Sequence, residues 1–104
     1  MKVAKKQLIK EQDILELSEM LKAIAHPARV AIMCLICNSA EGKLTVKCIY
    51  DELQMAQPVI SRHLGILKNS GLLERLIESS KTYYTLNNKN KNVRHISKCF
   101  RALK

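Results

Sequence analysis

Glycine and proline are scarce in this chain, which has three glycines and two prolines in 104 residues. A loop that cradles phosphate groups needs closely spaced glycines, so the sequence offers few places to build one. It also shows no pair of carboxylates and no nucleophile beside a base that would support catalysis. These absences argue against an enzyme, and we expect no cofactor.

Long apolar runs are also missing. No run approaches the roughly 18 residues of a membrane span, and the N-terminal stretch MKVAKKQLIK lacks the apolar core of a signal peptide. The four cysteines have neither the density nor the regular spacing of a secreted disulfide scaffold. We therefore expect a cytoplasmic protein with reduced thiols and no membrane partner.

Acidic residues are outnumbered: 9 Asp and Glu stand against 18 Lys and Arg, which gives a net charge of +9. Such a balance suits a nucleic-acid partner, although charge alone does not prove one. A hydrophobic content of 47% argues against disorder. The length predicts a single domain over 1–104, with residues 1–12 as a basic, flexible arm.

Two helices are predicted in the first third of the chain. Asp13 has the form of an N-cap, with Glu16 three residues later, and Leu17, Leu21 and Ile24 then form an apolar stripe. A second helix from Pro27 to about Asn38 is apolar nearly all round, as a buried central helix is. Residues 38–43 are expected to form a loop.

The next two predicted helices lie close together in the sequence. Thr45 is placed to cap a short helix in which apolar residues recur at helical spacing, namely Val46, Ile49, Tyr50 and Leu53. After Gln54 to Ala56 comes the segment QPVISRHLGILK, residues 57–68. Two helices joined by so tight a connection predict a helix-turn-helix.

The segment 57–68 divides into two faces at about 100° per residue. Ile60, Leu64 and Leu67 share one stripe, and polar donors lie elsewhere: Gln57, Ser61, Arg62 and Lys68. Such donors near the start of a helix can contact bases and phosphates in the major groove of DNA. The alternative is an ordinary amphipathic surface helix.

The C-terminal third changes character. The runs LLERLIE and KTYYTL predict a β-hairpin, although its turn lacks glycine. A last helix from about Asn92, spanning 92–104, has one narrow apolar side. We expect that side to form a dimer surface with the first helix, and the alternative is docking on its own domain. The expected interface residues are Leu17, Leu21, Val93, Ile96, Phe100 and Leu103.

The predicted order α-α-α-α-β-β-α, mainly α with a small hairpin, is that of a winged helix-turn-helix. Three segments resemble the ArsR/SmtB-type bacterial repressors: LKAIAHPARVAIMCLI, AQPVISRHLGILKNSGLL and KTYYTL. They match the family's "HPxR" entry to the second helix, its "SQPxxSRHLxxLxxxGLL" recognition segment and its "YYxL" wing strand. The resemblance covers roughly residues 17–86.

The resemblance implies a homodimeric repressor that binds double-stranded DNA at an inverted-repeat operator and releases it when an inducer, unknown here, binds. The family's DNA-facing positions correspond to Gln57, Ser61, Arg62 and His63, and Arg75 and Lys81 lie in or beside the wing. His63 borders the apolar stripe, so two roles are open: partial packing against the domain with a contact to one phosphate, and direct base contact. Ala56 stands where the family usually has Ser, which removes a helix cap.

Many members of the family bind soft metals through a Cys-Val-Cys triplet at the start of the third helix. Here the triplet is Thr45-Val46-Lys47, and a lysine cannot replace a thiolate ligand. On the last helix only His95 and Cys99 resemble ligands; this pair could contribute two ligands, but a site across a dimer would need precise placement. We therefore expect no metal.

Two alternatives stay open. Cys34 resembles the second-helix cysteine of the family's thiol-sensing branch, with Cys99 as its candidate partner, so a redox-responsive repressor is one. Buried structural thiols are the simpler interpretation of these cysteines. The other alternative is a winged-helix protein-interaction module without an operator, which would not need the donor face of residues 57–68.

Overall fold

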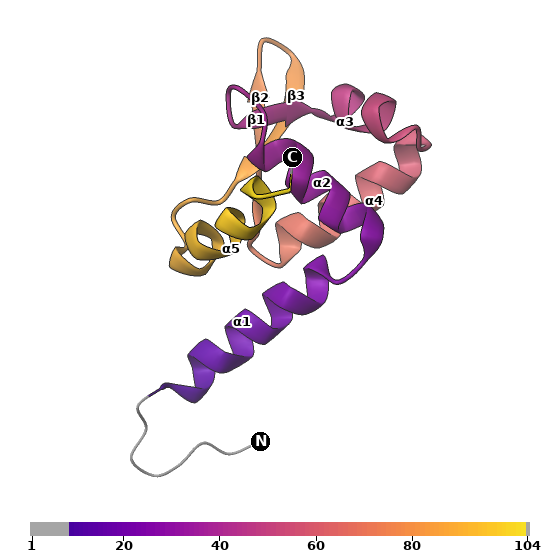
Figure 1. Cartoon of the computed structure of the whole chain (residues 1–104). Coiled ribbons are helices and arrows are strands. Elements are labelled where there is room, and N and C mark those ends of the chain that lie inside the picture. Colours follow the sequence, from indigo (N-terminus) through magenta and orange to yellow (C-terminus); the bar gives the residue numbers. More distant parts are fainter. Residues whose placement is uncertain (1–8, 104) are drawn as a thin grey trace.

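The computed structural model describes residues 9–103, and those residues form a winged helix with five helices and a three-stranded antiparallel sheet (Figure 1). The elements are α1 (Glu11–Ile24), α2 (Pro27–Cys37), β1 (Lys43–Thr45), α3 (Val46–Leu53), α4 (Gln57–Asn69), β2 (Leu73–Glu78), β3 (Lys81–Leu86) and α5 (Lys91–Arg101). The predicted fold class is confirmed. Within this part of the chain, no single helix is long and apolar enough to cross a membrane, and α1 and α2 reach that length only together, across a 99° bend.

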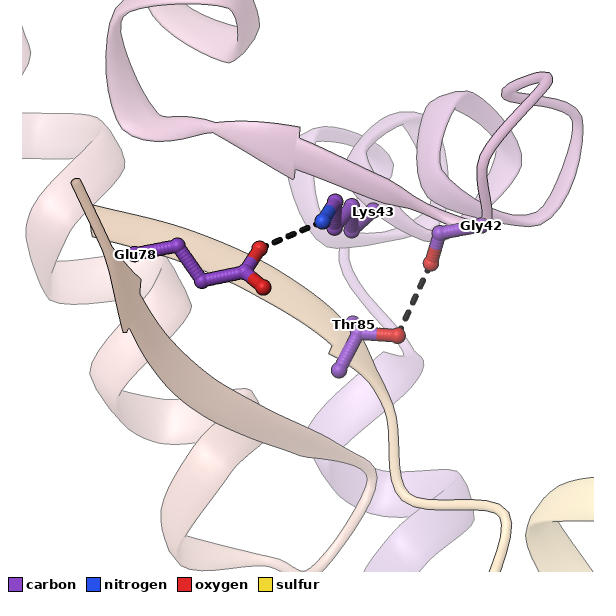
Figure 2. Close-up of polar contacts among 4 residues, drawn as sticks. All are labelled: Gly42, Lys43, Glu78 and Thr85. Atoms are coloured by element: carbon purple, nitrogen blue, oxygen red, sulfur yellow. Dashed lines mark hydrogen bonds and ion pairs between the residues drawn. The ribbon is translucent and has the colours of Figure 1, made fainter. Parts of the chain in front are cut away.

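The sequence does not predict strand β1, because a three-residue strand shows no periodicity and residues 38–43 have the composition of a loop. It pairs antiparallel with β3, and the sheet order is β1-β3-β2. Figure 2 shows two side-chain contacts that fasten this edge: Thr85 Oγ1 donates to the carbonyl of Gly42 at 2.8 Å, and Lys43 Nζ forms an ion pair with Glu78. The element order is therefore α-α-β-α-α-β-β-α.

Helix α1 begins at Glu11, two residues before the predicted start. Its N-cap is Lys10, which makes no side-chain capping bond, and Asp13 lies in the first turn. The cap prediction was therefore wrong. Acidic side chains in that turn favour the helix through its dipole without serving as the cap. Residues 11 and 12, assigned to the flexible arm, are helical, and residues 1–8 of that arm lie outside the described residues.

One contiguous core joins the helices and strands. Helix α2 lies at its centre, as its nearly uniform apolar sequence predicted, and Ile32, Met33 and Ile36 are fully buried. Within residues 9–103, the buried apolar residues are Met20, Ile24, Ile32, Met33, Ile36, Ile49, Ile60, Leu64, Leu67, Leu72, Leu73, Tyr84, Leu86, Val93 and Phe100.

Helix α5 packs on α2 in the same chain. Val93 is fully buried and Phe100 is 6% exposed, so these two residues belong to the chain's own core. The amide of Asn38, at the end of α2, donates to the carbonyl of Phe100 at 3.1 Å. For Val93 and Phe100 the predicted dimer role is therefore wrong, because their side chains are already covered.

The β2–β3 hairpin was predicted, and it turns through Ser79 and Ser80 alone. Both serines have positive φ, 49° and 65°, as the central residues of a type I′ turn do. Asn and Gly usually occupy these positions because they tolerate that conformation. The wing therefore closes on a turn whose residues are poorly suited to it.

Candidate nucleic-acid interface

Helices α3 and α4 form the helix-turn-helix. The hydroxyl of Thr45 accepts from the backbone N–H of Cys48 at 3.1 Å, which confirms the predicted cap of α3. Gln54 ends α3 in the left-handed conformation, with φ of 54°. Ala56 is extended and supplies no side-chain cap, and the N–H groups of Val59 and Ile60 donate to its carbonyl instead. Pro58 has no N–H, so the backbone donor left at the start of α4 is that of Gln57, which can reach a phosphate.

Helix α4 has the two faces that its sequence predicted. Ile60, Leu64 and Leu67 are fully buried against the domain. The predicted donors Gln57, Ser61, Arg62 and Lys68 are all exposed. The helix contains no acidic residue from its first position to its last. Its solvent face is therefore neutral or cationic throughout.

His63 does not share that face. Its side chain is 6% exposed, and its ring lies 4.8 Å from the ring of His26, centroid to centroid. Burial lowers the pKa of His63, with smaller contributions from His26 and Arg29. Of the two roles left open by the sequence, this burial agrees with packing against the domain and argues against direct base contact, and the place of His63 in the DNA-facing set stays a prediction.

His26 has a structural role that the sequence prediction missed. Its Nδ1 accepts from the backbone N–H of Ala28 at 3.1 Å and so caps α2. The His-Pro pair was a usable signal, because a residue before proline is extended, as an N-cap residue must be.

The wing contributes two exposed cations. Arg75 lies on β2 and Lys81 on β3, and both are exposed as predicted for surface contacts. Glu78, which pairs with Lys81 in the strand register, is engaged by Lys43. The carboxylate nearest the wing turn in sequence is thus partly neutralised, which leaves the hairpin end net basic.

The triplet at the start of α3 is occupied by structural side chains. Thr45 caps the helix, and Lys47 Nζ lies 2.6 Å from Asp51 Oδ2 one turn later. The hydrogen bond to Asp51 raises the pKa of Lys47, so it stays a cation. In residues 9–103 no three His, Cys, Asp or Glu side chains are grouped closely enough to hold a metal ion.

The candidate redox cysteines occupy different environments. Cys34 is half-buried and, with Cys48, lines an open apolar cavity of about 780 Å³ beside α2 and α3. Cys99 is exposed on α5 and is not among the residues lining this cavity. Burial raises the pKa of Cys34, and it raises that of Cys37 to about 11 against a partial opposing effect of Arg101. The α2 thiols are therefore protonated at neutral pH.

The predicted dimer surface divides into covered and uncovered parts. Leu21 on α1 is 50% exposed and Leu103 is 58% exposed, whereas Leu17 and Ile96 are half-buried. Leu15, 54% exposed, was missed because it lies off the predicted stripe. Figure 1 shows the N-terminal half of α1 extending away from the rest of the domain, and the other described residues leave Leu15 and Leu21 of this helix about half exposed.

A helix-turn-helix followed by a basic hairpin defines the winged-helix class. Residues 26–75 match the family model described as bacterial regulatory protein, arsR family. The biofilm growth-associated repressor of Agrobacterium fabrum is 32% identical over 76 residues, which cover 73% of this chain and 62% of that protein. The chain belongs to the ArsR family.

Two further relatives are HlyU proteins. The transcriptional activator HlyU of Vibrio cholerae is 31% identical over 67 residues, 64% of this chain and 59% of that protein. Its structure superposes with a TM-score of 0.78 over 90% of this chain and 97% of that chain, at 26% identity. HlyU of Vibrio vulnificus is 31% identical, with a TM-score of 0.73 over 89% and 92% of the two chains. The matches to the two curated relatives, the Agrobacterium fabrum repressor and the Vibrio cholerae activator, span about three fifths of the length of each.

Proposed function

We propose that this protein is a sequence-specific, DNA-binding transcriptional regulator that acts as a homodimer on an inverted-repeat operator. The observation that carries the proposal is the exposed face of α4, which has donors at Gln57, Ser61 and Arg62 and no acidic residue. Arg can bind guanine through two hydrogen bonds, and Gln and Ser can reach base edges or phosphates. A regulator of this kind works beside the chromosome, in the cytoplasm.

The uncovered apolar residues of α1 support the homodimer. Leu15 and Leu21 are each about half exposed on a helix that extends from the domain, and burying such side chains against a second copy removes apolar surface from water. A twofold dimer would present two α4 helices to successive major grooves, which is the geometry that an inverted repeat requires.

Whether such a regulator represses or activates transcription depends on where on the DNA it binds. One relative is named a repressor and another a transcriptional activator, so family membership is compatible with either. We favour repression, because a small dimer seated across an operator blocks the DNA without needing a further surface. The chain's own lysine at position 47 argues that any inducer is not a soft metal held at the start of α3.

An interaction module without an operator is the competing proposal. Such a module would use the apolar residues of α1 and α5 to hold another protein, and it would not need a basic, acid-free face on α4. The net charge of +9 and the exposed cations of the wing favour DNA.

Selection of bound sequences from random double-stranded DNA with the reduced protein tests the proposal. We expect an enriched inverted repeat whose half-site centres lie about one helical turn apart. The paired variant Gln57→Ala/Arg62→Ala, whose side chains lie on the surface, should enrich nothing beyond non-specific DNA. If the native protein enriches no sequence while remaining folded, the interaction module is the better proposal. Repeating the selection with peroxide and with Cys34→Ser tests a thiol response involving Cys34 and Cys99.

A further inference from the structure

The recognition helix meets the rest of the domain through a pair of histidines. His63 projects from α4 toward the joint between α1 and α2, where His26 caps α2. The two rings are tilted by 46°, with centroids 4.8 Å apart. Both α1 and α2 pack against α4, so this contact lies where the helix is seated. Arg62, the residue before His63, lies on the exposed face of α4.

The environment of His63 opposes a positive charge. Its Nδ1 atom is buried and has no hydrogen-bond partner. A protonated imidazole carries N–H donors on both nitrogens, so protonation would leave a charged donor buried without an acceptor. A neutral ring avoids most of that cost. Burial accordingly lowers the pKa of His63.

The charged groups that act on His63 add to this effect. They are His26 and Arg29 from the start of α2 and Arg62 from α4 itself. Among the described residues, α1, α3 and β2 also pack on α4, and none of their carboxylates contributes to the pKa of His63. Arg29 is itself constrained, since its Nε is buried without a partner. A proton on His63 would therefore add a positive charge near Arg29 with no carboxylate beside it to act as a counter-ion.

His26 links the same event to the start of α2. Its Nδ1 accepts from the backbone N–H of Ala28 and caps the helix, and its ring lies against that of His63. A charged His63 would therefore disturb a contact made by the residue that caps the central helix. Protonation of His63 thus acts against the packed arrangement of α4, α1 and α2.

We propose that His63, packed against His26, forms an acid-sensitive seat for the recognition helix, so that DNA binding requires the His63 ring to be neutral. In this proposal His63 is a positioning residue: it contacts no DNA and acts by fixing the orientation of α4. The proposal rests on the proposed function, because its readout is operator binding.

The direction of the effect distinguishes this proposal from ordinary electrostatics. A histidine near DNA that gains a proton normally strengthens binding to phosphates. Here protonation favours a state in which α4 is not correctly seated, and DNA selects the seated state. Affinity should therefore fall as the pH falls below about 6.5, the ordinary pKa of histidine, by at most about tenfold per pH unit for the one proton that His63 takes up.

The test measures affinity for the selected operator between pH 5.5 and 8 at constant ionic strength. The chain contains three histidines, so a matched set is available. His63→Leu replaces the buried ring with an apolar group. His26→Asn keeps a capping acceptor but cannot titrate in this range. His95→Gln changes the exposed histidine of α5 and serves as the control.

We expect the native protein and His95→Gln to lose affinity on acidification, His63→Leu to be nearly independent of pH, and His26→Asn to show a shallower loss. A native affinity that rises or stays constant on acidification would overturn the proposal, as would a full native pH dependence in both His63→Leu and His26→Asn. If His63→Leu does not fold, the His26→Asn profile decides alone.

A second readout separates this proposal from the proposed function. Urea unfolding at fixed protein concentration should show a free energy of unfolding that falls below pH 6.5 in the native protein and less steeply in His63→Leu or His26→Asn. A protein that binds no operator at pH 7.5 yet shows this difference refutes the DNA function and keeps the histidine seat. Equal pH slopes of stability in all variants refute the seat.

Discussion

Asn90 joins the first helix to the last: its Nδ2 donates to Glu16 Oε1 of α1 at 2.8 Å. The other end of the same side chain caps α5, where Oδ1 accepts from the backbone N–H of Asn92 at 2.8 Å and of Val93 at 3.4 Å. Val93, the third residue of α5, is fully buried. One polar side chain therefore positions the start of α5 and fastens α1 beside it.

Two substitutions, one at Asn90 and one at Glu16, separate the cap from the contact between helices. Asn90→Ala loses both and should lower the free energy of unfolding by about 1 kcal/mol, mainly through the cap. Glu16→Ala removes only the exposed hydrogen bond and should cost no more than about 0.5 kcal/mol. Urea unfolding at fixed protein concentration measures both. Equal losses in the two variants would mean that the contact between helices, rather than the cap, is the main contribution.

The wing turn can be improved by a single substitution. Ser80 has φ of 65°, where glycine suffers no steric penalty. Ser80→Gly should raise the free energy of unfolding by up to about 1 kcal/mol, because the strain removed outweighs the extra freedom of the unfolded chain. Ser18→Gly, at an exposed position inside α1, is the matched control and should lower it by a similar amount. A loss in both variants would contradict the strain argument.

Periodicity explains why most of the fold was predictable. The stripe Ile60, Leu64, Leu67 repeats at helical spacing, and the structure buries those residues and exposes the donors between them. Thr45 is a capping residue at the start of a short amphipathic run, so its role could be recognised locally. These features are encoded within a few residues of one another.

The features that were missed depend on partners far away in the sequence. Strand β1 exists because Lys43–Thr45 pairs with β3, some forty residues later, and nothing within three residues predicts that pairing. His63 lies at the border of two faces, and its burial was decided by His26 on another element. Val93 and Phe100 form an apolar seam on any helical projection, and only the position of α2 shows that the seam faces inward.

The exposed leucine of α1 provides a test of the dimer. Leu21 is 50% exposed in the single chain, so Leu21→Asp should leave the fold intact while placing a charge in the proposed interface. We expect the dimer dissociation constant to rise at least tenfold by analytical ultracentrifugation. Ile77→Asp is the control, because Ile77 is 64% exposed on the wing and should not affect association. A Leu21→Asp protein that remains as tightly dimeric as the native one would place the interface elsewhere.

The thiols should differ strongly in reactivity. Burial raises the pKa of Cys37 to about 11, so its reactive thiolate is rare at neutral pH, whereas Cys99 is exposed. Iodoacetamide at pH 7 should therefore modify Cys99 first and Cys37 much later, as followed by mass spectrometry. Because the thiolate fraction of Cys37 grows tenfold per pH unit below its pKa, its alkylation rate should rise by about that factor from pH 8 to 9. Modification of Cys37 before Cys99 at pH 7 would show that the helix opens readily.

Arg62 is the residue on which the DNA-binding proposal can be tested most sharply. It is exposed on α4 beside the buried His63, and its side chain makes no ion pair in the described part of the chain. If it binds guanine through two hydrogen bonds, Arg62→Ala should weaken operator binding by about 1 to 3 kcal/mol and relax specificity at one base pair.

A phosphate contact would behave differently. Arg62→Ala would then weaken binding to all sequences equally and reduce the salt dependence by about one ion. Lys89→Ala, in the loop before α5, is the control for a general loss of positive charge and should change neither quantity measurably. Gel-shift titrations at several salt concentrations, on the operator and on a site mutated at one base pair, distinguish the two modes. Unchanged affinity in Arg62→Ala would remove this residue from the interface and leave Gln57 and Ser61 as the candidates for base contact.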